Sequence, residues 1–165
     1  IEAGRFELSL GPIMMHGAAT RATESVRIAA ERKNIKLDLD IEEDLAATAD
    51  MRALDQVLLN LVANAIKYTP NDGEVIVRVR GVGERVRIEV EDNGPGIEEK
   101  HRGRLFERFY RVDPGRSKDM GGTGLGLAIV KHLVGSMAGN VGMIPAPLQG
   151  SIFWVELPAD DAPPA

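Results

Sequence analysis

The sequence predicts an α/β domain, a two-layer α/β sandwich in which helices cover one face of a mixed sheet of about five strands. Three observations predict this fold. Strand patterns and helix patterns interleave along the chain without regular βαβ repeats. Residues 51–68 carry one long amphipathic helix pattern. Two valine-rich segments, residues 74–80 and 85–91, flank a short glycine-containing turn and predict a hairpin.

The composition fits one globular domain. A length of 165 residues allows a substantial core, and 44% hydrophobic with 27% charged residues is ordinary. The chain has no cysteine, so it forms neither a disulfide nor a thiolate metal site. A net charge of −5 argues against a nucleic-acid surface, so a nucleotide would need locally placed Lys and Arg. No apolar run has the length of a membrane span.

The first part of the chain predicts four elements. Residues 5–10 alternate as a short strand, and residues 13–33 form a helix with a stripe of small apolar residues. Residues 46–49 form another short strand. Between these elements, residues 35–41 alternate as a strand with four side chains pointing inward: Ile35, Leu37, Leu39 and Ile41.

The helix at residues 51–68 is the best-defined element. Asp50 precedes it as a suitable N-cap. Asn60, Asn64 and Lys67 recur at i, i+4 and i+7, so they share one polar face. The neighbouring core stripe consists of Leu54, Val57, Leu58, Leu61, Val62 and Ala65.

The second part of the chain predicts two hairpins around an irregular stretch. In the first hairpin, the valines, Ile76 and Ile88 are expected on one face. Residues 94–121 show little periodicity and indicate either a functional lid or disorder. Residues 125–137 are helical, and residues 140–144 and 151–157 form the final hairpin. Prolines at 145 and 147 interrupt strand pairing there, so the length of that strand stays open.

The polar face of the helix at residues 51–68 has the chemistry of a metal and phosphate site. The amide oxygens of Asn60 and Asn64 suit a hard cation that is shared with substrate phosphates. Lys67 adds a positive charge, and Tyr68 adds a flat ring for a base or ribose. The alternative is an ordinary solvated helix face, although charged residues would serve that purpose better than paired asparagines.

Asp92 follows a β-rich run and precedes two glycines. An Asp at a buried strand end can accept a hydrogen bond from an exocyclic amino group such as that of adenine. Gly94 and Gly96 would let the backbone approach a ring closely. Taken alone, the same residues are also good turn chemistry, and a simple turn is then the better interpretation.

A glycine loop at residues 121–127 leads into the predicted helix at residues 125–137. Free N–H groups and the helix dipole at such a helix start suit phosphates. The spacing G-x-G-x-G matches neither the P-loop nor the dinucleotide fingerprint, so the loop alone is a weak signal. The irregular stretch before it holds aromatic and basic residues that could anchor a lid and reach phosphates: Phe106, Phe109, Tyr110, Arg111, Arg116 and Lys118. A mobile surface loop is the alternative.

These four motifs, in this order, resemble the catalytic and ATP-binding domain of bacterial two-component sensor histidine kinases. That domain belongs to the gyrase, chaperone, histidine-kinase and mismatch-repair ATPase superfamily. The resemblance covers about residues 5–158, with residues 1–4 as the stub of a preceding dimerisation helix and residues 159–165 as a disordered tail. It implies a Bergerat-type ATP-binding fold with a mobile ATP lid at about residues 95–121, and it implies ATP and Mg²⁺ as ligands.

The resemblance also implies a role for each matching residue. Asn64 would be the Mg²⁺ ligand with Asn60 assisting, Lys67 would contact phosphate, and Tyr68 would cover the nucleotide. Asp92 would accept from the adenine amino group. Gly94, Gly96 and Ile97 would shape the adenine pocket. Arg111 and Arg116 would be lid arginines near the β- and γ-phosphates, and Gly122, Gly124 and Gly126 would be the phosphate-side glycines. Thr123 and Leu125 complete the implied nucleotide contacts.

Position 60 separates two kinds of chemistry in this superfamily. Members that hydrolyse ATP resemble gyrase and carry a Glu four residues before the metal Asn, where it activates water. Asn60 is an amide and cannot act as a base. The resemblance therefore implies phosphoryl transfer to a protein side chain, a reaction that chiefly needs positioning and charge neutralisation.

The phosphoacceptor is expected on another domain. The family's acceptor histidine lies in a His-acid-x-x-[Thr/Asn]-Pro context, and His16, His101 and His132 do not. The implied partners are a dimerisation and histidine-phosphotransfer domain of the same parent and a response regulator, with no nucleic acid and no direct membrane contact. The fragment would be a cytoplasmic monomer from a homodimeric parent.

Two other functions fit the same residues. A serine kinase of the anti-sigma-factor kind would share the nucleotide pocket, and the acid stability of its phosphoprotein would distinguish it. A degenerate domain that binds partners without nucleotide is the non-enzymatic alternative. The presence of Asn64, Asp92 and the glycines speaks against it.

Overall fold

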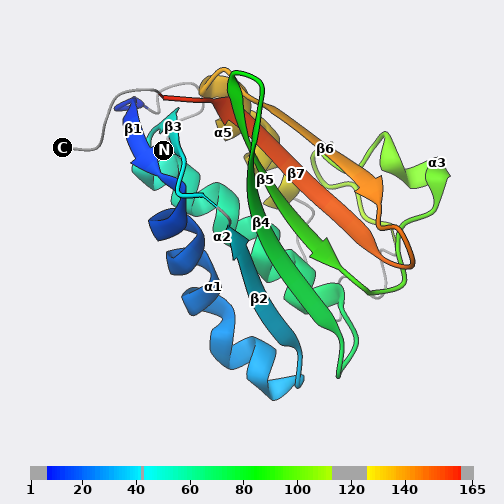
Figure 1. Cartoon of the computed structure of the whole chain (residues 1–165). Helices are drawn as coiled ribbons and strands as arrows, with labels where there is room; N and C mark the ends of the chain where they lie inside the picture. Colours follow the sequence, from blue (N-terminus) through cyan, green and yellow to red (C-terminus); the bar gives the residue numbers. More distant parts are fainter. Residues whose placement is uncertain (1–6, 42, 113–125, 161–165) are drawn as a thin grey trace.

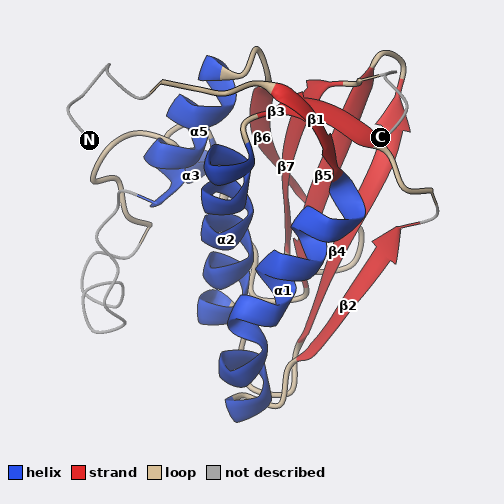
Figure 2. Ribbon diagram, turned by 90° about the vertical axis from the view of Figure 1, so that its left-hand side faces the viewer, coloured by secondary structure: helices blue, strands red, loops and turns tan. Residues whose placement is uncertain are grey.

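The computed structural model describes residues 7–41, 43–112 and 126–160 as a two-layer α/β sandwich. One layer is a five-stranded sheet in the order β2-β4-β5-β7-β6, and the other consists of helices on one face of that sheet (Figures 1 and 2). β2 pairs with β4 in parallel and the other neighbours are antiparallel, so the sheet is mixed. The predicted fold class is confirmed.

The element bounds follow the predicted order closely. The strands of the main sheet are β2 (Lys36–Ile41), β4 (Glu74–Val82), β5 (Arg85–Asp92), β6 (Asn140–Pro145) and β7 (Ser151–Pro158). A separate two-stranded sheet pairs β1 (Gly11–Met14) with β3 (Ala46–Ala49). The helices are α1 (Met15–Arg32), α2 (Met51–Tyr68), the short α3 (Glu99–Arg102) and α5 (Gly126–Ser136). None of the helices in the described ranges is both long and apolar enough to cross a bilayer.

The core lies between α1, α2 and the inner face of the sheet. All six residues of the predicted stripe on α2 are at most 5% exposed. The small side chains of Ala18, Ala22 and Ala30 on α1 are also buried, which lets the two long helices pack closely. The sheet contributes alternate residues such as Val75, Val77 and Ile88. This packing fixes the polar face of α2 relative to the ends of β5 and β7.

Three local predictions are wrong. Residues 7–10 form no strand; the N–H of Ser9 donates to the Asp50 carboxylate at 2.8 Å, and the pairing strand is β1 instead. Ile76 lies on the opposite face from Val75 and Val77, because side chains alternate along a strand. Leu39 is 36% exposed, because β2 is an edge strand, whereas Leu37 and Ile41 do pack against the core.

The final hairpin is confirmed, and the structure shows how long its first strand is despite the prolines. β6 ends at Pro145, which lies opposite Ser151 on an edge strand where a missing N–H is tolerated. The N–H of Ala146 then donates to the Gly150 carbonyl at 3.0 Å and closes the turn. β7 therefore keeps its full eight residues beside β5.

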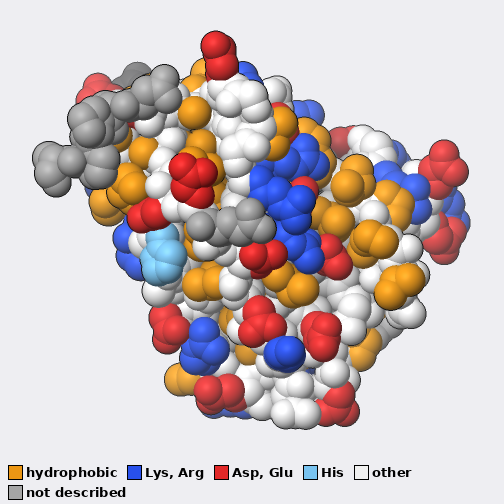
Figure 3. Space-filling view, viewed as in Figure 1, with side chains coloured by type: hydrophobic (Ala, Val, Ile, Leu, Met, Phe, Trp, Pro, Cys, Tyr) orange, Lys and Arg blue, Asp and Glu red, His pale blue; other side chains and the backbone are white. Residues whose placement is uncertain are grey.

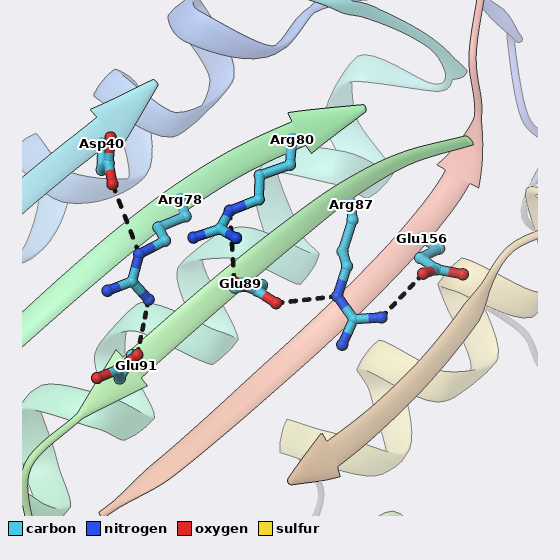
Figure 4. A network of polar contacts seen from close by, with 7 residues as sticks. All are labelled: Asp40, Arg78, Arg80, Arg87, Glu89, Glu91 and Glu156. Atoms are coloured by element: carbon cyan, nitrogen blue, oxygen red, sulfur yellow. Dashed lines mark hydrogen bonds and ion pairs between the residues drawn. The ribbon is translucent and has the colours of Figure 1, made fainter. Parts of the chain in front are cut away.

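Charged side chains gather on the outer face of the sheet (Figure 3), and ion pairs link them across the strands (Figure 4). Arg78 bridges Asp40 at 3.6 Å and Glu91 at 2.7 Å. Arg87 bridges Glu89 at 3.0 Å and Glu156 at 2.9 Å. These half-buried pairs join four strands on the face opposite the helices. The predicted site residues on α2 lie on the other side of the sheet.

Candidate nucleotide-binding site

Helix α2 is the element that positions most of the predicted site residues. The Asp50 carboxylate caps its start by accepting from the Ala53 N–H at 2.8 Å, as predicted. At the other end, Lys33 donates to the carbonyls of Ile66 at 2.8 Å and Lys67 at 3.0 Å. A cation on these last carbonyls complements the helix dipole. Both ends of α2 are therefore held while its polar face stays half-buried.

Asn60 connects α2 to the start of α5. Its side-chain Nδ2 donates to the carbonyl of Gly126 at 3.4 Å, and its Oδ1 accepts from Gln56 at 3.3 Å. Gly126 is the last of the implied phosphate-side residues and the first residue of α5. The structure therefore brings the paired-amide face and the end of the glycine loop together. The side chain of Asn64, one turn further along α2, has no hydrogen bond to another described residue.

Asp92 closes β5 at the opposite end of this polar face. Its Oδ1 accepts from the Gly94 N–H at 2.9 Å, and its carboxylate also accepts from the backbone N–H of Ser151 on β7. Burial raises the pKa of Asp92, and those two backbone donors oppose this effect only in part. Asp92 is thus a recessed acceptor fixed by two strands.

The glycines around Asp92 allow close backbone approach. A Cβ at Gly94 would lie 3.1 Å from Asp92 Oδ1 and 3.3 Å from the Tyr68 carbonyl oxygen. Gly94 therefore lies between the Asp92 carboxylate and the end of α2. Gly96 has a φ of +80°, a conformation that glycine adopts without strain. The roles predicted for both glycines toward an adenine ring stay predictions.

The two groups of residues are joined by one rigid helix. Asn60 and Tyr68 are eight residues apart on α2, which corresponds to about 12 Å along its axis. Lys67 lies near Tyr68, with its Nζ 5.5 Å from the ring centroid, and Tyr68 is 41% exposed. Along α2, Asn64 and Lys67 lie between Asn60, which contacts Gly126, and the C-terminal end of the helix, which adjoins Gly94. This arrangement suits an elongated ligand with a polar ring at one end and anionic groups at the other.

The lid region is partly within the described residues. Ile97 packs against the core, and its carbonyl accepts from Arg102 Nε at 3.0 Å. Arg111 is half-buried directly after the aromatic residues of this segment. Five predicted site residues lie outside the described ranges: Arg116, Gly122, Thr123, Gly124 and Leu125.

Three residues near Asp92 were missed by the sequence reasoning. Ser151 supplies a backbone donor to Asp92, and Gly150 has a φ of +105° against the Asp92 carbonyl. Thr69 is fully buried, and its hydroxyl has no hydrogen-bond partner among the described residues. In the sequence, Thr69 followed by Pro70 indicates only a helix end. The sequence shows only that Ser151 begins a predicted strand. Its contact with Asp92 follows only once β7 is known to pair with β5.

A groove of about 890 Å³ lies between the lid segment and the outer side of α5. Its apolar lining includes Phe106, Phe109, Ile129 and Leu133. The charged or titratable residues that line it within the described ranges are Arg108, Lys131 and His132, which are all basic. The lining of this groove does not include Asp92, and the groove adjoins the helix that begins at Gly126.

The fold and the site together define an ATP-binding α/β sandwich of the kind found in histidine kinases. Residues 49–161 match the family model described as histidine kinase-, DNA gyrase B-, and HSP90-like ATPase, and the chain belongs to that family.

Known relatives agree with this assignment. The chain is 36% identical over 161 residues to the circadian input-output histidine kinase CikA of Synechococcus elongatus, covering 96% of this chain and 21% of CikA. Among solved structures, full-length ShkA in complex with AMPPNP has a TM-score of 0.84 at 36% identity, covering 97% of this chain and 33% of ShkA. The nucleotide-free catalytic domain of the histidine kinase ThkA has a TM-score of 0.81 at 25% identity, covering 92% and 96%.

The match covers only part of the longer relatives. The chain spans between 19% and 39% of the length of three curated relatives that it matches. The fold is nevertheless that of the histidine-kinase catalytic domain, as the sequence resemblance implied.

Proposed function

We propose that this chain binds Mg·ATP and transfers the γ-phosphoryl group to a histidine on a separate dimerisation and phosphotransfer domain, for relay to a response regulator. The observation that carries the proposal is the arrangement along α2. The middle of the helix holds Asn60 against Gly126, and its C-terminal end meets Gly94 beside the recessed Asp92. This single rigid element would align the base and the phosphates of one nucleotide.

The Asp92 pocket is the proposed adenine site. A recessed carboxylate held by two backbone N–H groups retains lone pairs for an amino-group donor. Gly94 and Gly96 would leave room for a flat ring, with Ile97 as an apolar wall. Tyr68 would cover the nucleotide. The similarity to ShkA, whose structure holds AMPPNP, supports an adenine nucleotide as the ligand.

The Asn64 side of α2 is the proposed Mg²⁺ and phosphate site. The donor chemistry fits, because Asn64 presents an amide oxygen that is not used by another described residue. Asn60 already bonds Gly126 and Gln56, so it would assist chiefly by fixing the start of α5. A bound Mg²⁺ would neutralise charge on the phosphates. Lys67 would contact phosphate from the next turn of the helix.

Transfer is favoured over hydrolysis because the described site lacks a base at the position where hydrolysing members have one. Asn60 can donate and accept hydrogen bonds but cannot take a proton from water. Arg111, together with Arg116, would stabilise the charge on the transferring phosphoryl group. The remaining implied contacts, Gly122, Thr123, Gly124, Leu125 and Gly126, would bind phosphates at the start of α5.

The basic groove beside α5 is the proposed docking surface for the acceptor domain. Phe109 is 68% exposed and Ile129 is 40% exposed, so apolar side chains face outward at both walls. Arg108, Lys131 and His132 would complement an acidic residue next to the acceptor histidine. An amphipathic helix carrying that histidine would complement the groove in apolar character and in charge.

Two measurements test the proposed function. Calorimetry with the isolated chain should show binding of AMPPNP that requires Mg²⁺ and binding of ADP, but no binding of guanine nucleotides. Mixing the chain with [γ-³²P]ATP and the parent's acceptor domain should give an acid-labile phosphoprotein. Absence of adenine-nucleotide binding would support the degenerate-domain alternative, and an acid-stable phosphoprotein would support the serine-kinase alternative.

A further inference from the structure

The segment before Arg111 is folded by a repeating backbone pattern. Four successive hydrogen bonds of the i to i+3 type run from residue 98 to residue 110. Their donors and acceptors are His101 N to Glu98 O at 3.0 Å, Arg104 N to His101 O at 3.0 Å, Glu107 N to Arg104 O at 3.0 Å, and Tyr110 N to Glu107 O at 3.3 Å. Bonds of this type build short, tight turns. The segment is therefore ordered up to Tyr110.

The side chains at the same positions also contact one another. The Tyr110 hydroxyl is hydrogen-bonded to His101 Nδ1. The Arg104 guanidinium lies over the Tyr110 ring at 4.4 Å from its centroid, and Arg104 Nε pairs with Glu107 at 3.0 Å. We call His101, Arg104, Glu107 and Tyr110 the clasp. Its central contact joins α3 to the residue immediately before Arg111.

A left-handed residue closes the clasp. Phe109 has a φ of +64°, which is unfavourable for a bulky side chain and costs about 1 kcal/mol or more. The Phe109 side chain is 68% exposed, so its own burial offsets little of that cost. The reversal at Phe109 instead brings Tyr110 back toward His101. The contacts of Tyr110 therefore help to hold the strained residue in place.

The clasp is fixed to the core of the domain. Leu105, inside the clasp, is 6% exposed. Phe106 packs edge-on against Phe153 of β7, with ring centroids 6.3 Å apart. Arg102 ties the end of α3 to the Ile97 carbonyl. Through these contacts the position of Tyr110 is set by β7 and by the segment that follows Asp92.

We propose that His101 and Tyr110 are positioning residues that orient Arg111 toward the nucleotide phosphates. The inference rests on the proposed function, because it needs Arg111 to contact a bound triphosphate. Arg111 is the next residue after Tyr110, so the Tyr110 anchor restricts the backbone from which the Arg111 side chain extends. Losing the anchor would leave Arg111 present but poorly directed, and the lost orientation weakens its phosphate contact.

A double-mutant cycle tests the inference. Calorimetry would measure the affinities of the chain for AMPPNP with Mg²⁺ and for ADP, using wild type, Tyr110→Phe, Arg111→Ala and the double variant. We expect Tyr110→Phe to weaken AMPPNP binding about fivefold, because that is the change in affinity that the loss of one typical hydrogen bond produces. ADP binding should change little. In the Arg111→Ala background, Tyr110→Phe should have no further effect.

A rescue series at position 101 separates positioning from folding. His101→Gln keeps a group that can bond the Tyr110 hydroxyl and should retain the preference for AMPPNP, whereas His101→Phe should lose it about fivefold. His16→Phe is the matched control, because His16 is exposed and far along the chain from the clasp. Thermal melts would verify that each variant is folded.

The outcomes separate the two proposals. If the wild-type chain binds no adenine nucleotide, the proposed function is overturned and the clasp inference with it. If the wild type binds and Arg111→Ala loses the preference for AMPPNP, but Tyr110→Phe does not, only the clasp inference is overturned. Equal weakening of ADP and AMPPNP by Tyr110→Phe, or additive effects in the double variant, would also overturn it.

Discussion

Gly150 packs directly against the backbone of Asp92. A Cβ atom at position 150 would lie 1.9 Å from the Asp92 carbonyl oxygen and 2.8 Å from the Cα of Asn93. Gly150 also has a φ of +105°, which side chains other than glycine rarely adopt. The turn before β7 therefore packs against the backbone that carries the proposed adenine acceptor, Asp92, and it admits only glycine at this position.

Gly150→Ala should disrupt the Asp92 pocket. The clash and the left-handed backbone together should lower the free energy of unfolding by about 2 kcal/mol or more, because the β5–β7 pairing must shift. Denaturant unfolding and nucleotide calorimetry would measure both effects. Gly11→Ala is the matched control, since no atom lies within 4 Å of its Cβ position. A Gly150→Ala chain with wild-type stability and binding would contradict this account.

Asp92→Asn should stabilise the nucleotide-free chain while weakening nucleotide binding. Burial raises the pKa of Asp92 in the folded chain above its unfolded value of 3.8, so keeping it ionised costs stability as the pH rises through that interval. Removing the charge should therefore raise the free energy of unfolding at pH 7. The gain should vanish well below pH 3.8. Unfolding curves at both pH values and calorimetry with ADP would check this.

The same variant tests the adenine assignment. An Asn side chain can still accept from Gly94, but it presents a mixed amide where the amino group needs an acceptor. ADP affinity should fall at least about tenfold, because a buried donor is left poorly paired. Unchanged ADP affinity would place the adenine elsewhere.

Asn64→Ala should remove the Mg²⁺ dependence of AMPPNP binding. The side chain is half-buried on the polar face of α2 and has no hydrogen bond to another described residue, so its loss should leave the fold intact. Calorimetry with and without Mg²⁺ would measure the effect, and phosphoryl transfer should fall about a hundredfold or more. Asn71→Ala, in the exposed turn after α2, is the control. Full transfer activity in Asn64→Ala would refute the metal role.

Asp50→Ala should destabilise the whole domain. Burial works to raise the pKa of Asp50, but the backbone N–H groups of Ala53, Ser9 and Arg52 together lower it. Loss of the N-cap should cost about 1–2 kcal/mol at pH 7. A lowered pKa means that this stabilisation is present above pH 3.8 and is lost as the pH falls through the folded-state pKa.

The control for this variant is Asp50→Asn, which keeps a capping oxygen without the charge. Its stability deficit relative to wild type should be smaller than that of Asp50→Ala and should narrow at low pH. Denaturant unfolding as a function of pH would show this. A deficit that is independent of pH would mean that the charge of Asp50 does not contribute.

Ile129→Glu should block transfer to the acceptor domain without changing nucleotide affinity. The side chain is 40% exposed in the groove, so the substitution places a charge on the proposed docking surface at little cost to folding. Phosphotransfer assays with the acceptor domain would be compared with ADP calorimetry. Ile28→Glu, at a 66% exposed position on α1, is the matched control. Equal transfer rates in both variants would exclude this groove as the docking surface.

Periodicity and turn chemistry determined most of the fold. The α2 stripe and the Asp50 cap predicted the helix that the structure contains, Met51–Tyr68, and the valine-rich segments predicted the β4–β5 hairpin. These predictions succeed because local patterns reflect burial on one face. The prediction for Ile76 is wrong because side chains alternate along a strand, so Ile76 faces away from Val75 and Val77 despite its hydrophobicity.

The site was predictable where its residues share one helix. Asn60, Asn64 and Lys67 follow from helical spacing alone. Contacts between segments far apart in the sequence were not predictable, such as Asn60 with Gly126 or Asp92 with Ser151. Such pairs depend on which strands become neighbours, and a single sequence carries no local signal for that.

The sequence by itself determined the α/β class, the polar face of α2 and the family to which the chain belongs, because these depend on periodicity and on ordered motifs. Only the tertiary structure decided that Gly150 closes the Asp92 pocket and that Tyr110 turns back onto His101. The physical reason is that close backbone approach and a left-handed reversal arise from packing between segments, and neither leaves a repeating pattern along the chain.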